Sequence, residues 1–244
     1  MKNFRSDFPV FETHPNLIYL DSTASALKPR IVIEETSRFS VESYANIHRG
    51  AYPLSEAAEI VYDRSKKRVA NFIGANSPAE IVYTYNATYA LNYLAGSMRR
   101  SGWIGRGDKI LVSLAEHHAN VVPWQMLAEE VGATVEFVRL DESYDLDFAD
   151  FERKYDDSVR VVALAHVSNV TGKIFSLERL SAMLRDDTYL VVDASQSAPG
   201  AFLDVQMLDA DFAFFTGHKM FAETGLGVLW GREDLLREMR PAFG

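Results

Sequence analysis

Short apolar runs alternate along the chain with longer amphipathic segments. The runs are rich in Val, Ile, Tyr and Phe, and their near-continuous hydrophobicity is typical of strands that are covered on both faces. They predict strands at residues 81–85, 109–114, 134–140, 159–168, 189–195, 212–217 and 227–231.

The amphipathic segments between these runs predict helices at residues 88–102, 122–132, 147–155 and 176–187. Further upstream, residues 55–74 predict a long helix with Ser55 as its N-terminal cap and Gly74 as its stop. Because strands alternate with helices, we expect βαβ crossovers and an α/β fold whose sheet is mostly parallel with helices on both faces. Residues 1–20 look like an N-terminal arm, and residues 21–244 like one large domain.

Composition narrows the class of protein. The chain has 244 residues and is 48% hydrophobic and 24% charged, as expected for a globular protein with a sizeable core. Its net charge of -9 argues against a nucleic-acid partner or an anionic membrane surface. No apolar run approaches the roughly 20 residues of a membrane span, and the first residues lack the apolar segment of a signal peptide. We therefore expect a cytoplasmic protein.

The sequence contains no cysteine. Disulfides, thiolate metal sites and a cysteine nucleophile are therefore excluded for these 244 residues.

Polar side chains follow several of the predicted strands. In a parallel sheet, ligands bind beyond the carboxyl ends of the strands, often where the N-terminus of a helix points toward them. One such polar segment means little, because any surface loop is polar, but several at one edge of a sheet indicate a site. The segments are 86–88, 116–120, 166–169, 193–196 and 216–219.

Asp193 and Lys219 are the most informative of these residues. Asp193 directly follows an apolar run, where a carboxylate is either a turn or cap residue or the partner of a positive group such as a protonated ring nitrogen or a metal. A lysine is usually a solvated surface charge, but Lys219 stands at the end of another apolar run, where loss of water would lower its pKa and suit Schiff-base chemistry. Together they are the pair that a pyridoxal 5'-phosphate site requires.

The same edge offers groups for the rest of that cofactor. Thr88 opens a predicted helix, whose N–H groups and dipole favour a phosphate. Thr216 and His218 flank Lys219 and add a hydroxyl and an imidazole, while His117 offers a flat ring for stacking.

At this point the chain resembles the large domain of the class V aminotransferase family, a PLP-dependent transferase fold of the aspartate aminotransferase type. Within that family it is similar to the cysteine desulfurase and selenocysteine lyase branch of the SufS type. The matching segments occur in family order at 19–29 (YLDSTASALKP), 48–55 (HRGAYPLS), 116–125 (EHHANVVPWQ), 166–172 (HVSNVTG), 191–200 (VVDASQSAPG) and 214–219 (FFTGHK).

The resemblance implies roles for single residues. Lys219 would hold the cofactor as an aldimine and move protons, and Asp193 would pair with the pyridine nitrogen. His117 would stack on the ring and assist proton transfer. Asn169 and Gln196 would contact the ring near O3′.

It also implies a phosphate cradle, an entrance and partners. Thr88, Thr216 and His218 would bind the phosphate, and His48 and Arg49 would lie near the entrance of the active site. The substrate would be cysteine or selenocysteine. We expect a homodimer with sites at the subunit interface, a sulfur-acceptor protein as a further partner, and a role in iron–sulfur cluster assembly.

The sequence departs from the family pattern in four places. Ala222 stands where the family has Gly, which would strain a turn that needs positive φ, and Glu223 would bring a negative charge near the phosphate. Tyr89 replaces an acidic residue, and Ala194-Ser195 is a milder change.

The fourth departure is at the C-terminal end. Family chains continue into a small C-terminal domain that supplies the persulfide-forming cysteine and the arginine that binds the substrate carboxylate. We therefore expect this chain to be incomplete on its own. A C-terminal half on a second chain, an interrupted reading frame and a non-catalytic half-domain that binds a partner are the explanations left open.

Other functions fit the sequence less well. A Rossmann dehydrogenase is disfavoured because no predicted strand is followed by Gly-x-Gly-x-x-Gly. A metal hydrolase has no supporting ligand spacing among the histidines, and the adjacent His117 and His118 cannot share one helix face. Within the family, a class V aminotransferase or an epimerase remains the enzymatic alternative.

Overall fold

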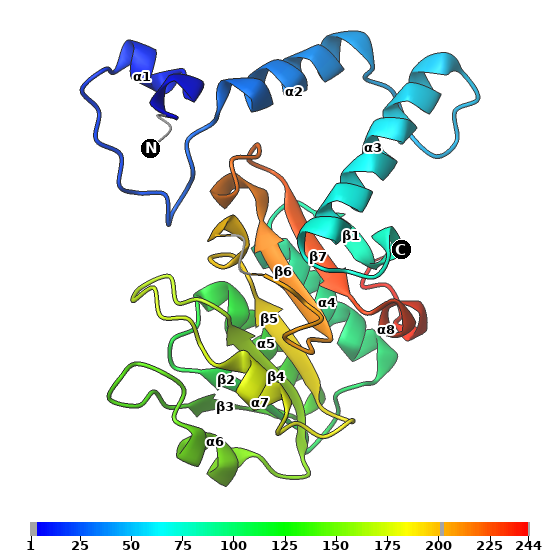
Figure 1. Cartoon of the computed structure of the whole chain (residues 1–244). Coiled ribbons are helices and arrows are strands. Elements are labelled where there is room, and N and C mark those ends of the chain that lie inside the picture. The colour runs from blue at the N-terminus through cyan, green and yellow to red at the C-terminus, as the bar shows by residue number, and fades with distance from the viewer. Residues whose placement is uncertain (1–3, 201–202, 244) are drawn as a thin grey trace.

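A mixed β-sheet forms the centre of the computed structural model, which describes residues 4–200 and 203–243 (Figure 1). Within these residues the sheet has seven strands in the order β1-β7-β6-β5-β4-β2-β3. Strand β7 is antiparallel to both of its neighbours, β1 and β6, and the other pairs are parallel. Each strand coincides with a predicted one, which confirms the α/β class and the mostly parallel sheet. The strands are β1 (Ile81–Thr84), β2 (Lys109–Ser113), β3 (Thr134–Val138), β4 (Val159–Ala165), β5 (Tyr189–Asp193), β6 (Phe212–Thr216) and β7 (Gly227–Gly231).

Helices cover both faces of the sheet, and alternate strand positions point to opposite faces. On one face, Ile110 and Val112 of β2 pack in a buried cluster with apolar side chains of α4 (Ala87–Ser101) and α5 (Val122–Val131). On the other face, Leu111 belongs to a cluster that includes residues of α3 (Pro53–Phe72), α6 (Phe148–Lys154) and α7 (Leu177–Ser181). These two cores explain why the strands read as continuous apolar runs.

Two helix predictions were wrong in detail. Ser55 does not cap α3, because the helix begins at Pro53 with Tyr52 as its N-cap; Ser55 is buried inside the first turn and donates to the carbonyl of Asn46 at 2.7 Å. The predicted helix over 176–187 is limited to α7, and residues 182–188 form turns instead. The stop of α3 was right: Gly74 follows the helix with φ of 73°.

The N-terminal part lies apart from the sheet for much of its length (Figure 1). It contains η1 (Arg5–Asp7), α1 (Val10–Thr13) and α2 (Arg30–Glu42), none of which has a buried residue. Residues 1–3 of the predicted arm lie outside the described residues. None of the helices in the described residues is long and apolar enough to cross a membrane.

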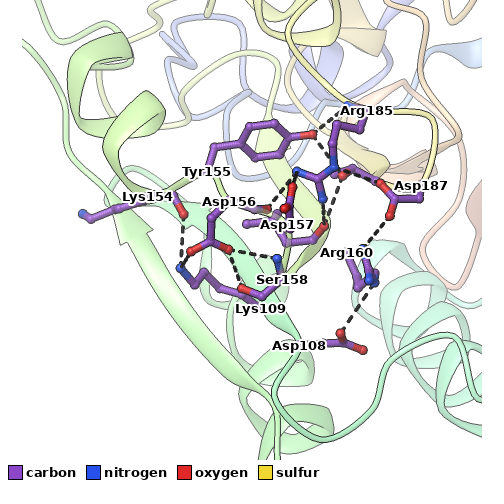
Figure 2. Close-up of polar contacts among 12 residues, drawn as sticks. Asp108, Lys109, Lys154, Tyr155, Asp156, Asp157, Ser158, Arg160, Arg185 and Asp187 are labelled. Carbon is purple, nitrogen blue, oxygen red and sulfur yellow. Dashed lines mark hydrogen bonds and ion pairs between the residues drawn. The ribbon is translucent and has the colours of Figure 1, made fainter.

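The amino-terminal edge of the parallel strands is closed by ion pairs between loops (Figure 2). Lys109 at the start of β2 lies 2.8 Å from Asp156, and Arg160 lies 2.6 Å from Asp187. Arg185 binds Asp187 and also donates to the carbonyls of Asp156 and Val159. Because these charges are largely paired with one another, they hold the loops of this edge together. The pocket described below lies at the opposite edge.

Candidate active site

The carboxyl ends of the strands surround a pocket of about 560 Å³. Strands β3, β2, β4, β5 and β6 are parallel, and β1 runs in the same direction as β6 because both are antiparallel to β7. Within the described residues, six strands therefore end at this edge. A volume of this size suits a small ligand or cofactor. Eight of the ten predicted site residues line it, namely Thr88, His117, Asn169, Asp193, Gln196, Thr216, His218 and Lys219.

Asp193 forms the buried acidic part of the pocket. It is the last residue of β5 and is 7% exposed, and its Oδ1 accepts a hydrogen bond from the backbone N–H of Ser195 at 2.9 Å. Burial raises the pKa of this carboxyl, while the Ser195 hydrogen bonds and the charges of Lys219 and His117 oppose the rise. A buried carboxylate with so little compensation gains from a cationic partner in the pocket.

Lys219 enters the pocket from the end of β6. The strand passes into the short turn η5 (Gly217–Lys219), and a side chain at Gly217 would lie 3.1 Å from the carbonyl oxygen of Leu226. Lys219 is half-buried, and burial lowers the pKa of its amine while Asp193 acts in the opposite direction. Loss of water thus makes the amine a better nucleophile than a surface lysine.

The N-terminus of α4 lies at one end of the pocket. Asn86 caps the helix by accepting the N–H of Tyr89 at 2.9 Å, and the N–H of Ala90 bonds to the carbonyl of Asn86. Ala87 and Thr88 line this end of the pocket, and the N–H groups in the first turn of a helix have no partner within the helix. They give this end of the pocket a positive potential.

Gly227 allows this helix to begin where it does. A Cβ at this position of β7 would lie 2.4 Å from the backbone carbon of Asn86, too close for any side chain. Glycine at 227 therefore sets the close approach between β7 and the turn that opens α4.

Thr216 and His218 are joined to each other beside Lys219. Thr216 Oγ1 and His218 Nδ1 lie 2.8 Å apart, and both residues line the pocket. Burial lowers the pKa of His218, and the positive charges of Lys219 and Lys28 lower it further. His218 is therefore suited to act as a neutral hydrogen-bonding group.

His117, Asn169 and Gln196 come from three separate loops. His117 precedes the short turn η3 (His118–Asn120), and its Nδ1 accepts the N–H of Ala119 at 3.1 Å. Asn169 follows β4, and Gln196 follows β5 and donates to the carbonyl of Thr23 at 3.0 Å. The sheet edge thus gathers one side chain from each loop onto one pocket.

The structure does not bring His48 and Arg49 to this pocket. His48, with φ of 74°, lies 3.5 Å from Glu59, and its ring packs edge-to-face against Tyr62 of α3. Arg49 is exposed in the same loop between α2 and α3. Neither is among the residues that line the pocket.

The strand-end argument missed one wall of the pocket. Asp21, Thr23 and Ala24 line it from the N-terminal segment, and the N–H of Ala26 donates to the carbonyl of His218 at 2.9 Å. The sequence did contain a signal for this wall: segment 19–29 matches the family pattern although it follows none of the predicted strands. Further lining residues include Tyr85, Asn86, Ser195, Thr224 and Gly225.

The turn after Lys219 does not have the backbone strain at Ala222 or the negative charge of Glu223 in the pocket that we expected from the sequence. The residue with positive φ is Phe221, at 65°, and Ala222 does not adopt that conformation. The turn is held from outside, since Lys28 donates to the carbonyl of Ala222 and the ring of Phe8 packs against Phe221. Glu223 is exposed and does not line the pocket, so the predicted charge near the phosphate site is not found there.

Comparison with known proteins agrees with this geometry. The sequence model of the family described as Aminotransferase class-V matches residues 18–244. The chain belongs to the class-V aminotransferase family. That match spans the whole pocket, including the N-terminal wall and the lysine of η5.

Several proteins similar to this chain are named as cysteine desulfurases. A probable cysteine desulfurase from Synechocystis sp. is 41% identical over 98% of this chain and 58% of its own length. The apo structure of a cysteine desulfurase from Thermococcus onnurineus NA1 is 39% identical with a TM-score of 0.89, covering 97% of this chain and 58% of that one. A cysteine desulfurase from Escherichia coli, in an S-sulfonic acid form, is 36% identical with a TM-score of 0.88, covering 99% and 61%. The chain thus spans about three fifths of the length of these relatives.

Proposed function

We propose that this chain is the cofactor-binding part of a pyridoxal-phosphate enzyme that acts on cysteine or selenocysteine, as cysteine desulfurases do. The observation that carries the proposal is the pairing of Lys219 and Asp193 in one pocket, where burial lowers the pKa of the amine and raises that of the carboxyl. In the proposed division of the chain, residues 21–244 form the cofactor-binding domain and residues 1–20 an arm.

The residues present fit this cofactor. When bound, pyridoxal phosphate supplies an aldehyde that reacts with amines and a ring that accepts electrons. The anion site at the N-terminus of α4 suits its phosphate, and Thr216 and His218 add donors beside it. Asp193 offers a buried carboxylate to a protonated ring nitrogen, whose positive charge would add to the compensation from Lys219, His117 and Ser195.

In this proposal the other side chains of the pocket either hold the cofactor or move a proton. Lys219 would hold the cofactor through its Nζ, and its amine would accept and return a proton. His117 would contact the cofactor ring and assist the proton transfer. Asn169 and Gln196 would orient the ring, and the hydrogen bond from Gln196 to Thr23 fixes the Gln196 side chain against the N-terminal wall.

We further propose that catalysis needs a partner chain, either a second copy of this chain or a complementing C-terminal half. The described residues leave large apolar side chains exposed, including Ile18, Leu20 and Val41 at 81%, 90% and 85%. A homodimer, or a complementing C-terminal half, would cover such a surface. His48 and Arg49 would reach an active-site entrance only across such an interface, because within one chain they lie outside the pocket.

The remaining expectations follow from the relatives. Their greater length suggests that the persulfide-forming cysteine and the carboxylate-binding arginine come from residues beyond these 244. Transfer of sulfur to an acceptor protein and a role in iron–sulfur cluster assembly in the cytoplasm are part of the same proposal.

The absorption spectrum of the purified chain after addition of pyridoxal phosphate tests the proposal. We expect a visible band that survives desalting and that borohydride reduction fixes on the peptide containing Lys219. Lys219→Ala should lose the band, whereas Lys67→Ala, which removes an exposed lysine of α3, should keep it. A folded wild-type chain without any band would contradict the cofactor assignment and favour a half-domain that only binds a partner.

A further inference from the structure

Glu116, the residue before His117, joins three elements at the edge of the pocket. Its Oε1 accepts the hydroxyl of Ser113 at the end of β2, at 2.5 Å. Its Oε2 accepts the Nδ2 amide of Asn120 in η3, at 2.7 Å. The backbone of Ala165, the last residue of β4, donates to the same carboxyl. One side chain thus ties the turn that carries His117 to two neighbouring strand ends.

The turn is also anchored below, in the core. Asn120 is fully buried, and its Oδ1 accepts the indole N–H of Trp124 at 3.3 Å. Trp124 is itself fully buried between α5 and the sheet. The backbone N–H of Asn120 returns to the carbonyl of His117 at 2.8 Å, so the connection runs from the core to the imidazole residue.

This turn decides which nitrogen of His117 carries the proton. The N–H of Ala119 donates to Nδ1, which must therefore be the unprotonated nitrogen of the neutral ring. The proton of neutral His117 then lies on Nε2. The tautomer and the orientation of the ring both depend on the shape of η3, because both partners of this hydrogen bond belong to the turn.

The carboxyl of Glu116 is enclosed by donors and by one like charge. Its pKa is raised to about 7, mainly by burial and to a smaller extent by the charge of Asp193 at the end of β5, while the hydrogen bonds from Ser113, Asn120 and Ala165 oppose the rise. From β2, η3 and β4 the groups that reach it are uncharged donors, and the acidic group comes from β5. Glu116 does not line the pocket, so any effect on the chemistry passes through its neighbours.

We propose that Glu116 is a positioning residue, whose carboxyl holds the turn from Ser113 to Asn120 so that His117 faces the pocket as its Nε2–H tautomer. It acts through His117 and not on a substrate. This proposal rests on the proposed function only where it assigns His117 a role toward the cofactor. The hydrogen bonds that hold the turn from Ser113 to Asn120 do not depend on any cofactor.

The test is the tautomer of His117 in the cofactor-free chain, measured by long-range proton–nitrogen NMR on protein labelled with ¹⁵N-histidine. The His117 signals are assigned by their loss in His117→Asn. In the wild type we expect the Nε2–H form to dominate. Glu116→Ala should reduce its ratio to the other tautomer by about threefold or more, the change that loss of one net hydrogen bond produces. Glu129→Gln, an exposed change on α5, should leave the ratio unchanged.

A folded Glu116→Ala chain with the wild-type tautomer ratio would overturn the proposal, because a residue that only stabilises the fold would lower the melting temperature and leave the imidazole unaffected. Should Glu116→Ala fail to fold, Ser113→Ala removes a single hydrogen bond from the carboxyl and should shift the ratio in the same direction. An unchanged ratio in Ser113→Ala would then refute the idea.

Addition of pyridoxal phosphate to the same proteins separates this proposal from the proposed function. A tautomer shift without any visible band in the wild type would leave the positioning role intact and contradict the cofactor assignment. A normal band together with an unresponsive His117 would contradict the positioning role alone.

Discussion

Replacement of Glu116 by glutamine should change how the stability of the chain depends on pH. Burial raises the pKa of this carboxyl from its ordinary 4.5 to about 7. The folded chain therefore keeps a proton on Glu116 at pH values where the unfolded chain has released it. The contribution of this residue to the free energy of unfolding is complete below pH 4.5 and is lost as the pH rises to 7.

The size of the effect follows from the shift. A difference of about 2.5 pKa units at 1.36 kcal/mol per unit gives at most about 3 kcal/mol between pH 4.5 and pH 7.5. Glutamine stays neutral throughout, so the Glu116→Gln chain should gain stability relative to the wild type over this range. The relative gain should reach a plateau above pH 7.

Other groups titrate in the same window, and a difference measurement removes them. Burial raises the pKa of Asp211 to about 6, which gives a loss of the same sign, and lowers the pKa of His166 and His218, which gives the opposite sign. Both proteins share these three groups, so they cancel in the difference. Asp193, whose pKa is also raised by burial, interacts with the charge of Glu116 and therefore contributes to the difference together with it.

Urea unfolding at pH 4.5, 5.5, 6.5 and 7.5 measures the effect, with Glu129→Gln as the exposed control. A difference between Glu116→Gln and the wild type that stays constant with pH would refute the reasoning, because it would mean that Glu116 titrates alike in both states.

Two further changes test parts of the pocket, and a third tests a buried contact away from it. Gly227→Ala forces a methyl group to within 2.4 Å of the backbone of Asn86, and should cost roughly 1–3 kcal/mol in urea unfolding while weakening retention of pyridoxal phosphate. Asn86→Ala removes the cap of α4 and should cost about 1 kcal/mol, with a weaker affinity for inorganic phosphate that titration calorimetry would detect; an unchanged affinity would count against the helix N-terminus as the anion site. Trp230→Phe deprives the buried Glu80 of the indole N–H that it accepts at 2.9 Å, and should cost roughly 1–3 kcal/mol without altering the visible band of the bound cofactor.

The sheet and the edge that carries the pocket could be predicted from local patterns. Each strand is a near-continuous apolar run because it lies between two helical layers, and this pattern is visible in the sequence without any knowledge of its neighbours. Asp193 and Lys219 were found because parallel strands deliver the residues that follow them to one edge. The exact helix starts were not found, since Ser55 looks like a cap in sequence but is buried in the first turn of α3.

The closure of the pocket depends on contacts that no local pattern contains. Thr23 and Gln196 are 173 positions apart, yet they share a hydrogen bond, and Ala26 binds the backbone beside Lys219. Phe221, and not Ala222, takes the strained conformation because Lys28 and Phe8 hold that turn from the N-terminal segment. The role of Glu116 likewise appears only when Ser113, Asn120 and Ala165 meet around its carboxyl. The sequence by itself determined the strands and the choice of Asp193 and Lys219 as candidate groups, because hydrophobic periodicity and residue chemistry are local properties. Tertiary structure decided the surroundings that shift the pKa values of these groups, because burial and hydrogen bonding depend on residues far apart in the chain.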